Sequence, residues 1–137
     1  MPEESTTPDL IERVRGLVGA VDRHDLDTFA SFHAPDAVFE AYIGRFEGVA
    51  TIVGFVEDWL ASYEDFAVTL EEVRDLGNCV TFCVLRHQGR LVGSSGHVQL
   101  SHAMVNVWVD GAVARTISGP DIDKIRTAAE RLAEERG

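Results

Sequence analysis

The sequence has few basic residues. Its 137 residues include 12 lysines and arginines against 23 aspartates and glutamates, which gives a formal net charge of −11. An acidic surface repels the phosphates of nucleic acids and the headgroups of anionic lipids. We therefore expect no nucleic acid and no membrane among the partners of this protein. An acidic balance of this kind is typical of a soluble protein surface.

Cysteine is also scarce, with only Cys79 and Cys83 in the chain. If both lie on one strand, their Cα atoms are about 13 Å apart, whereas a disulfide needs less than about 7 Å. Two unpaired thiols favour a reducing compartment, so we predict a cytoplasmic protein. Residues 1–7 are polar and lack the apolar core of a signal peptide. No run of about 18 apolar residues is present to span a membrane.

The first half of the chain carries apolar residues at helical spacing. Residues 1–7 are predicted to be a disordered lead-in, and Thr7-Pro8 resembles a helix N-cap followed by proline at the first helical position. Asp25 is the predicted cap of a second helix, and Gly48 precedes a third. The predicted apolar faces are Leu10, Val14, Leu17, Val18 and Val21; Leu26, Phe29, Ala30 and Phe32; and Ile52, Val53, Phe55, Val56, Trp59, Leu60 and Tyr63.

The second half of the chain changes to the period of two that is typical of strands. Strands are predicted at residues 66–76, 79–87, 97–109 and 112–118, after a short one at 37–42 that follows a turn at Pro35-Asp36. Further turns are expected at 77–78, 88–89 and 110–111, and the Gly/Ser segment 93–96 is expected to bend the sheet. A last helix starts after Gly119. Helices followed by an antiparallel meander indicate one α+β domain over residues 8–137.

Four short motifs occur in an order that resembles a known family. They are VGAVDRHDLD at 18–27, FHAPDAVF at 32–39, RFEG at 45–48 and VWVDGAV at 107–113. Together they resemble the SnoaL-like and ketosteroid-isomerase-like proteins of the nuclear transport factor 2-like superfamily, over about residues 8–132. The resemblance implies a cone-shaped, curved antiparallel sheet of the cystatin-like kind, with the N-terminal helices packed on its concave face. It also implies a small apolar ligand held inside the cone.

The family's known acids and bases do not transfer to this chain. Steroid-isomerase-like members use an aspartate base and an oxyanion hole made by a tyrosine and a protonated aspartate. The matching positions here hold Ala41, Leu17 and Val105, none of which can move a proton. Ser118 stands where epoxide-hydrolase-like members carry a carboxylate. An isomerase of that mechanism is therefore not expected.

Two other residues are candidates for acid–base chemistry. His87 alternates with Cys83 and Leu85, so it should face the cone, unless it simply lies in water at the strand end. Glu40 neighbours the missing base, although alternation should turn it away from the cone. His102 is expected on the outer face of its strand, opposite His97, so those two do not form a pair.

Neither a metal nor another cofactor is expected. His24 and His33 are predicted to be exposed, and no HExxH or CxxC motif occurs. Cys83 has no basic neighbour to lower its pKa, so it is expected to be a core residue that borders the pocket. The aromatic residues near the third helix, including Phe46, either close the mouth of the cone or pack in the core. The predicted pocket comprises Leu17, Phe39, Ala41, Phe55, Trp59, Tyr63, Cys83, Leu85, Val105, Thr116 and Ser118.

The outer face of the predicted sheet carries apolar residues. We expect a homodimer that buries this patch sheet to sheet, through Val80, Phe82, Val84, Met104 and Trp108. Three functions remain open: an isomerase, cyclase or hydratase acting on a small hydrophobic substrate; a non-catalytic binding module for an apolar ligand; and a dimerisation scaffold.

Overall fold

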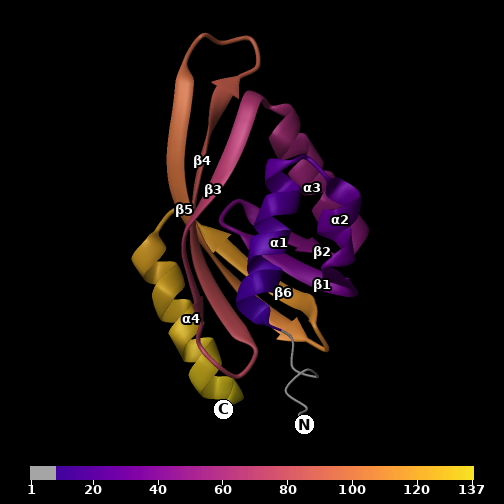
Figure 1. The fold of residues 1–137 in the computed structure, drawn as a ribbon, viewed down its shortest axis with the longest axis vertical. Helices are drawn as coiled ribbons and strands as arrows, with labels where there is room; N and C mark the ends of the chain where they lie inside the picture. Colours follow the sequence, from indigo (N-terminus) through magenta and orange to yellow (C-terminus); the bar gives the residue numbers. More distant parts are fainter. Residues whose placement is uncertain (1–8) are drawn as a thin grey trace.

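The computed structural model describes residues 9–137, which form a curved six-stranded sheet with helices on both faces (Figure 1). The predicted α+β class is confirmed. Residues 1–7 and the expected Thr7 cap lie outside the described part of the chain. The helices are α1 (Leu10–Asp22), α2 (Leu26–Ser31), α3 (Val49–Ala61) and α4 (Ile122–Arg136). The strands are β1 (His33–Ala41), β2 (Gly44–Glu47), β3 (Tyr63–Asp75), β4 (Val80–Leu91), β5 (His97–Val109) and β6 (Ala112–Gly119).

The strands lie in the order β2-β1-β6-β5-β4-β3. Strands β3 to β6 form the predicted antiparallel meander, and β1 pairs with β2 as an antiparallel hairpin. Strand β1 runs parallel to β6, however, so the sheet is not antiparallel throughout. A parallel pair needs a long connection, and here β2, α3 and strands β3 to β5 supply it.

Side-chain caps begin three of the helices. Asp9, rather than Thr7, caps α1, because its carboxylate accepts a hydrogen bond from the amide of Glu12. Asp25 caps α2 as predicted and Asp121 caps α4, each through the amide three residues later. These carboxylates satisfy amides that would otherwise lack a partner at the helix start.

The elements differ from the sequence predictions at several boundaries. Pro35 and Asp36 lie within β1, where the pairing with β6 shifts register, rather than in a turn. Strand β4 continues through Gln88 and Gly89, where a turn or bulge was predicted. A Cβ atom on Gly89 would lie 3.1 Å from the Glu64 carbonyl oxygen, so this glycine lets β3 approach closely. Residues 93–96 belong to the connection between β4 and β5.

Helices α1, α2 and α3 cover one face of the sheet, and α4 covers part of the other (Figure 1). The packing of α4 removes the exposed patch from which we predicted a dimer. Val80, Phe82 and Val84 are buried beneath α4 within one chain. Met104 and Trp108 belong to the opposite face, packed with α1 and α2 in the main core.

The strand register explains this correction. Met104 pairs with Cys83, whereas Phe82 pairs with Val105. Directly paired residues share a face, so Met104 lies with Cys83 under α1 to α3, and Val105 lies under α4. The homodimer itself remains a prediction, but its interface is not the surface that was predicted. In the described residues, no helix is long and apolar enough to cross a membrane.

Candidate functional site

A cavity of about 410 Å³ lies between the inner face of the sheet and helices α1 and α3. Volumes of this size are typical of small-molecule sites. The rim is apolar, because Tyr42, Ile43 and Leu100 line the cavity while being 79%, 63% and 53% exposed. The remaining lining residues are Leu17, Val18, Val21, Phe29, Phe39, Ala41, Phe55, Val56, Trp59, Tyr63, Val68, Leu85, His87, Ser101, His102, Met104, Ser118, Gly119 and Pro120.

Most of the predicted pocket residues line this cavity. They are Leu17, Phe39, Ala41, Phe55, Trp59, Tyr63, Leu85 and Ser118, together with the candidate base His87. Aromatic packing supports the wall of the cavity from behind, because Phe46 stacks on the lining residue Phe55 with ring centroids 4.3 Å apart. The aromatic residues of α3 therefore serve both as cavity wall and as core.

Three predicted pocket residues lie elsewhere. Cys83 is buried in the main core, and burial raises its pKa to about 12, so it is not a nucleophile at neutral pH. Val105 faces α4 on the other side of the sheet. Thr116 is buried, and its hydroxyl oxygen accepts a hydrogen bond of 2.9 Å from the side-chain amide nitrogen of Asn106. Alternation correctly placed Cys83 inside, but it did not place it on the cavity wall.

Glu40 is not among the residues that line the cavity. Its carboxylate pairs with Arg45 of β2 at 3.1 Å and with Arg115 of β6 at 3.0 Å. This placement agrees with the expectation that Glu40 points away from the cone.

His87 and His102 come together at the cavity wall. Their ring centroids lie 5.3 Å apart with an interplanar angle of 64°. They project from neighbouring strands, because His87 pairs with Leu100 and His102 lies two residues further along β5. The prediction that His102 faces outward is therefore wrong.

Aromatic rings surround the two histidines. Trp59 approaches His87 at 5.0 Å and His102 at 6.3 Å between ring centroids, and Phe66 stacks on His87 at 5.9 Å. His87 is only 6% exposed, and within residues 9–137 neither of its ring nitrogens has a hydrogen-bond partner. Burial lowers the pKa of His87, and burial together with the neighbouring His87 lowers the pKa of His102 to about 4. Both imidazoles are therefore neutral at pH 7.

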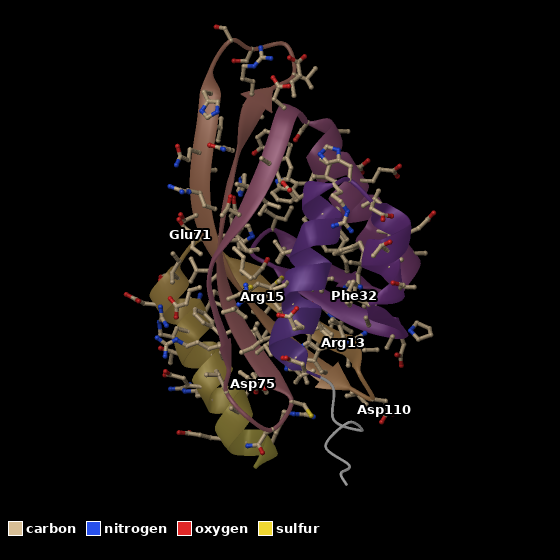
Figure 2. The ribbon with its side chains drawn as sticks, in the orientation of Figure 1. Arg13, Arg15, Phe32, Glu71, Asp75 and Asp110 are labelled. Atoms are coloured by element: carbon tan, nitrogen blue, oxygen red, sulfur yellow. The ribbon has the colours of Figure 1, made fainter. Side chains whose placement is uncertain are left out.

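The cavity has no fixed charge. Among residues 9–137, no aspartate, glutamate, lysine or arginine lines it, and the titratable lining residues are His87, His102, Tyr42 and Tyr63. The guanidinium of Arg13 lies outside the lining, 5.1 Å from the Phe32 ring centroid. Arg13 also lies 5.7 Å from the ring centroid of Trp108 on β5, and Figure 2 shows Arg13 and Phe32 far from the loop that joins β4 and β5. In the described part of the chain, no cluster of three or more potential ligands could hold a metal.

The other histidines have different surroundings. His33 is buried and its Nδ1 lies 2.9 Å from the Phe29 carbonyl oxygen, so the prediction that it is exposed is wrong. Burial lowers its pKa. His24 is exposed in the turn after α1, as predicted, and His97 is exposed on β5.

The sequence contains a pattern from which the proximity of His87 and His102 could have been predicted. The observed register centres the β4–β5 hairpin between Gly93 and Ser94, inside the Gly/Ser segment. A hairpin centred there places His102 diagonally across from His87 on the same face. Treating that segment as a bend within the sheet concealed this relationship.

Comparison with known proteins agrees with this architecture. The SnoaL-like domain family matches the sequence over residues 14–116. The chain belongs to the SnoaL-like family. A comparison with curated proteins finds no match for this SnoaL-like chain.

Solved structures with the same fold are distant in sequence. A protein assigned as a SnoaL-like polyketide cyclase from Jannaschia sp. CCS1 is 16% identical, with a TM-score of 0.76 over 95% of this chain and 97% of that one. A nuclear transport factor 2-like protein of unknown function from Burkholderia pseudomallei K96243 is 14% identical, with a TM-score of 0.73 over 90% and 98%. A protein with a ketosteroid-isomerase-like fold from Catenulispora acidiphila DSM 44928, solved with trimethylamine, is 16% identical, with a TM-score of 0.71 over 82% and 85%. At these identities the similarity establishes the fold of the SnoaL-like chain.

Proposed function

We propose that this SnoaL-like protein is an enzyme that moves a proton on a small apolar substrate, with His87 and His102 as its acid–base pair. The observation that carries the proposal is the approach of the two rings to 5.3 Å at the wall of a 410 Å³ cavity. Isomerisation, cyclisation and hydration all require such a proton transfer at a carbon or oxygen atom.

The protonation state of the pair suits a base. With its pKa lowered by burial, His87 is neutral at pH 7, so a ring nitrogen is free to accept a proton. The same nitrogens have no partner within the described residues, so a substrate does not compete with an internal hydrogen bond. His102 is close enough to respond electrostatically to a charge that develops on His87.

A binding module is the second candidate, and a specific observation favours it. Leu17 and Ala41 line the cavity, and the sequence resemblance matches them to positions where steroid-isomerase-like proteins carry catalytic groups. Within the residues that the structure describes, no carboxylate replaces them in the lining. A cavity of this kind can retain an apolar molecule without changing it.

Hydrogen–deuterium exchange on a model ketone separates the two candidates. The probe is 2-tetralone, an apolar bicyclic ketone whose α-protons exchange slowly in neutral D₂O and are followed by NMR. We expect the protein to accelerate the exchange. The substitutions His87→Gln and His102→Gln should each reduce this acceleration at least about tenfold, because general acid–base catalysis typically contributes more than that. His97→Gln, at an exposed position on the same strand as His102, is the matched control.

The outcomes are distinct. Acceleration that depends on both histidines supports the enzyme. Shifts of cavity resonances without faster exchange support the binding module for this class of molecule. Exchange that is equally fast in the His87→Gln and wild-type proteins contradicts the assigned pair.

A further inference from the structure

The cavity contains bases without a complementary acid. His87 and His102 face it, and Tyr42 and Tyr63 lie on its wall, while no aspartate or glutamate of residues 9–137 lines it. A neutral imidazole has one nitrogen that accepts and one N–H that donates. An imidazole without partners in apolar surroundings can therefore donate one hydrogen bond through its N–H, and its other nitrogen can accept a hydrogen bond or a proton.

His87 carries this imbalance most clearly. Its side chain is 6% exposed, and both ring nitrogens lack a hydrogen-bond partner within residues 9–137. Buried polar groups in native proteins are nearly always paired, since an unpaired one costs about 1–3 kcal/mol. The rings of Trp59, Tyr63, Phe66 and His102 surround it and pack against it.

We infer that the cavity selects an apolar ring compound that bears one acidic oxygen, such as a carboxylic acid, a phenol or an enolised dicarbonyl, and binds that oxygen at His87 and His102. This inference rests on the proposed function and narrows its substrate class. The acidic oxygen supplies the partner that His87 lacks. The rest of the ligand lies against the apolar walls formed by residues such as Leu17, Val68 and Leu85.

The binding step conserves protons and charge. A ligand that enters as the neutral acid transfers the proton from its O–H bond to an imidazole nitrogen, which leaves an oxyanion beside an imidazolium. A ligand that is already ionised in solution takes up one proton from the solvent on the same nitrogen. Either way the charges appear as a pair inside the cavity, so no isolated ion is buried.

The two histidines share this one positive charge. Their rings are too close for both to be protonated readily, since each cation would repel the other. In the described part of the chain, no lysine or arginine lines the cavity to neutralise a second anionic group. The pair thus fits a ligand with one acidic group, and a dianion would remain incompletely compensated.

Calorimetry with two isosteric probes tests this inference. The probes are 2-naphthoic acid and 2-naphthamide, which have nearly the same shape but differ in acidity, because the amide keeps its N–H groups at neutral pH whereas the acid is ionised. Each is titrated into the full-length protein at neutral pH in phosphate and in Tris, because the difference in buffer ionisation enthalpy reports proton uptake. We expect naphthoate to bind at least about tenfold more tightly than naphthamide and to take up about one proton, as the pairing of an oxyanion with an imidazolium requires.

The variants show whether the preference for naphthoate and the proton uptake depend on His87. His87→Gln should equalise the two affinities and abolish proton uptake, whereas His97→Gln should leave both unchanged. The inference is overturned if naphthamide binds as tightly as naphthoate, or if naphthoate binds without proton uptake. Both outcomes are measured on the wild-type protein, so the test holds even where a variant fails to fold. Proton-coupled naphthoate binding without acceleration of 2-tetralone exchange supports the ligand class while rejecting the enzyme. Failure of both probes to bind while exchange proceeds rejects the ligand class alone.

Discussion

The imidazole of His87 meets that of His102 at a centroid distance of 5.3 Å, across the boundary between β4 and β5. The two rings lie diagonally on one face of the sheet and share Trp59 as an aromatic neighbour. Because no carboxylate of residues 9–137 lines the cavity beside them, burial keeps both in the neutral form. This relationship governs the chemistry that the cavity supports and much of the protein's expected response to pH.

Removing the unpaired nitrogens should stabilise the ligand-free protein. We expect His87→Phe to raise the free energy of unfolding by about 1–3 kcal/mol, because phenylalanine preserves the ring packing without a buried unpaired N–H. The same substitution should eliminate acid–base activity. Urea denaturation measures the stability, with His97→Phe, at an exposed position, expected to change it by less than about 0.5 kcal/mol. A less stable His87→Phe protein would show that the ring nitrogens do have effective partners.

Acid should destabilise the protein before its carboxylates are neutralised. Burial lowers the folded-state pKa values of His33, His87 and His102 below the unfolded value of 6.5, that of His102 to about 4. Between those values the unfolded chain binds more protons, so stability is greatest above pH 6.5 and falls as the pH approaches 4. Melting temperatures across pH 7.5 to 4 should show this loss.

The double variant His87→Gln/His102→Gln identifies the groups responsible. Its stability should depend less steeply on pH in that window than that of the wild type. Glu72 titrates in a different range, because hydrogen bonds from Arg126 and Arg74 lower its pKa to about 2. The stability it contributes is therefore present above pH 4.5 and lost toward pH 2. An unchanged pH profile in the double variant would contradict the assignment.

A buried hydrogen bond supports the sheet on the same face as the cavity. The indole N–H of Trp108 donates to the Thr81 hydroxyl at 2.9 Å, and both residues are 1% exposed. Thr81→Val keeps the shape of the side chain but leaves the indole unpaired, so we expect a loss of about 1–3 kcal/mol. Thr69→Val, at an exposed position on β3, should cost less than about 0.5 kcal/mol in the same urea measurement. Equal effects of both variants would show that the bond adds nothing.

Filling the cavity should block binding while leaving the fold intact. Ala41 lines the cavity near its rim, so Ala41→Trp places an indole in the space that a ligand would occupy. We expect 2-naphthoate binding to fall at least about tenfold, with little change in melting temperature. Ala50→Trp, at an exposed position on α3, is the matched control. Naphthoate that still binds the Ala41→Trp protein with full affinity must occupy another site.

The oligomeric state of the protein depends on which surface remains uncovered. A homodimer is still predicted, but α4 covers Val80, Phe82 and Val84, so those residues are not its interface. Light scattering of the full chain should give twice the 15.0 kDa chain mass if the dimer uses another surface. Truncation after Pro120 uncovers the apolar face and should strengthen self-association. A truncated chain that stays monomeric would show that this face does not drive association.

Local patterns predicted most of the elements and part of the site. Helical spacing defined the apolar faces of α1 and α3, and alternation along β4 put His87 on the same face as Cys83 and Leu85. These predictions hold because the phase of side chains within one element depends only on its own backbone geometry. The aspartate cap of α2 was equally local, since it involves residues three apart.

The tertiary structure decided which side-chain face of one element packs against which face of another. Alternation along β5 separates His102 from Val105, but it does not say which of them faces α1 and α3; the hairpin register with β4 does. In the same way, the apolar stripe of α4 predicted a helix without predicting that it covers Phe82 and displaces the expected dimer surface. Burial of apolar area is non-directional, so the sequence fixes which residues need covering, and only long-range packing selects what covers them.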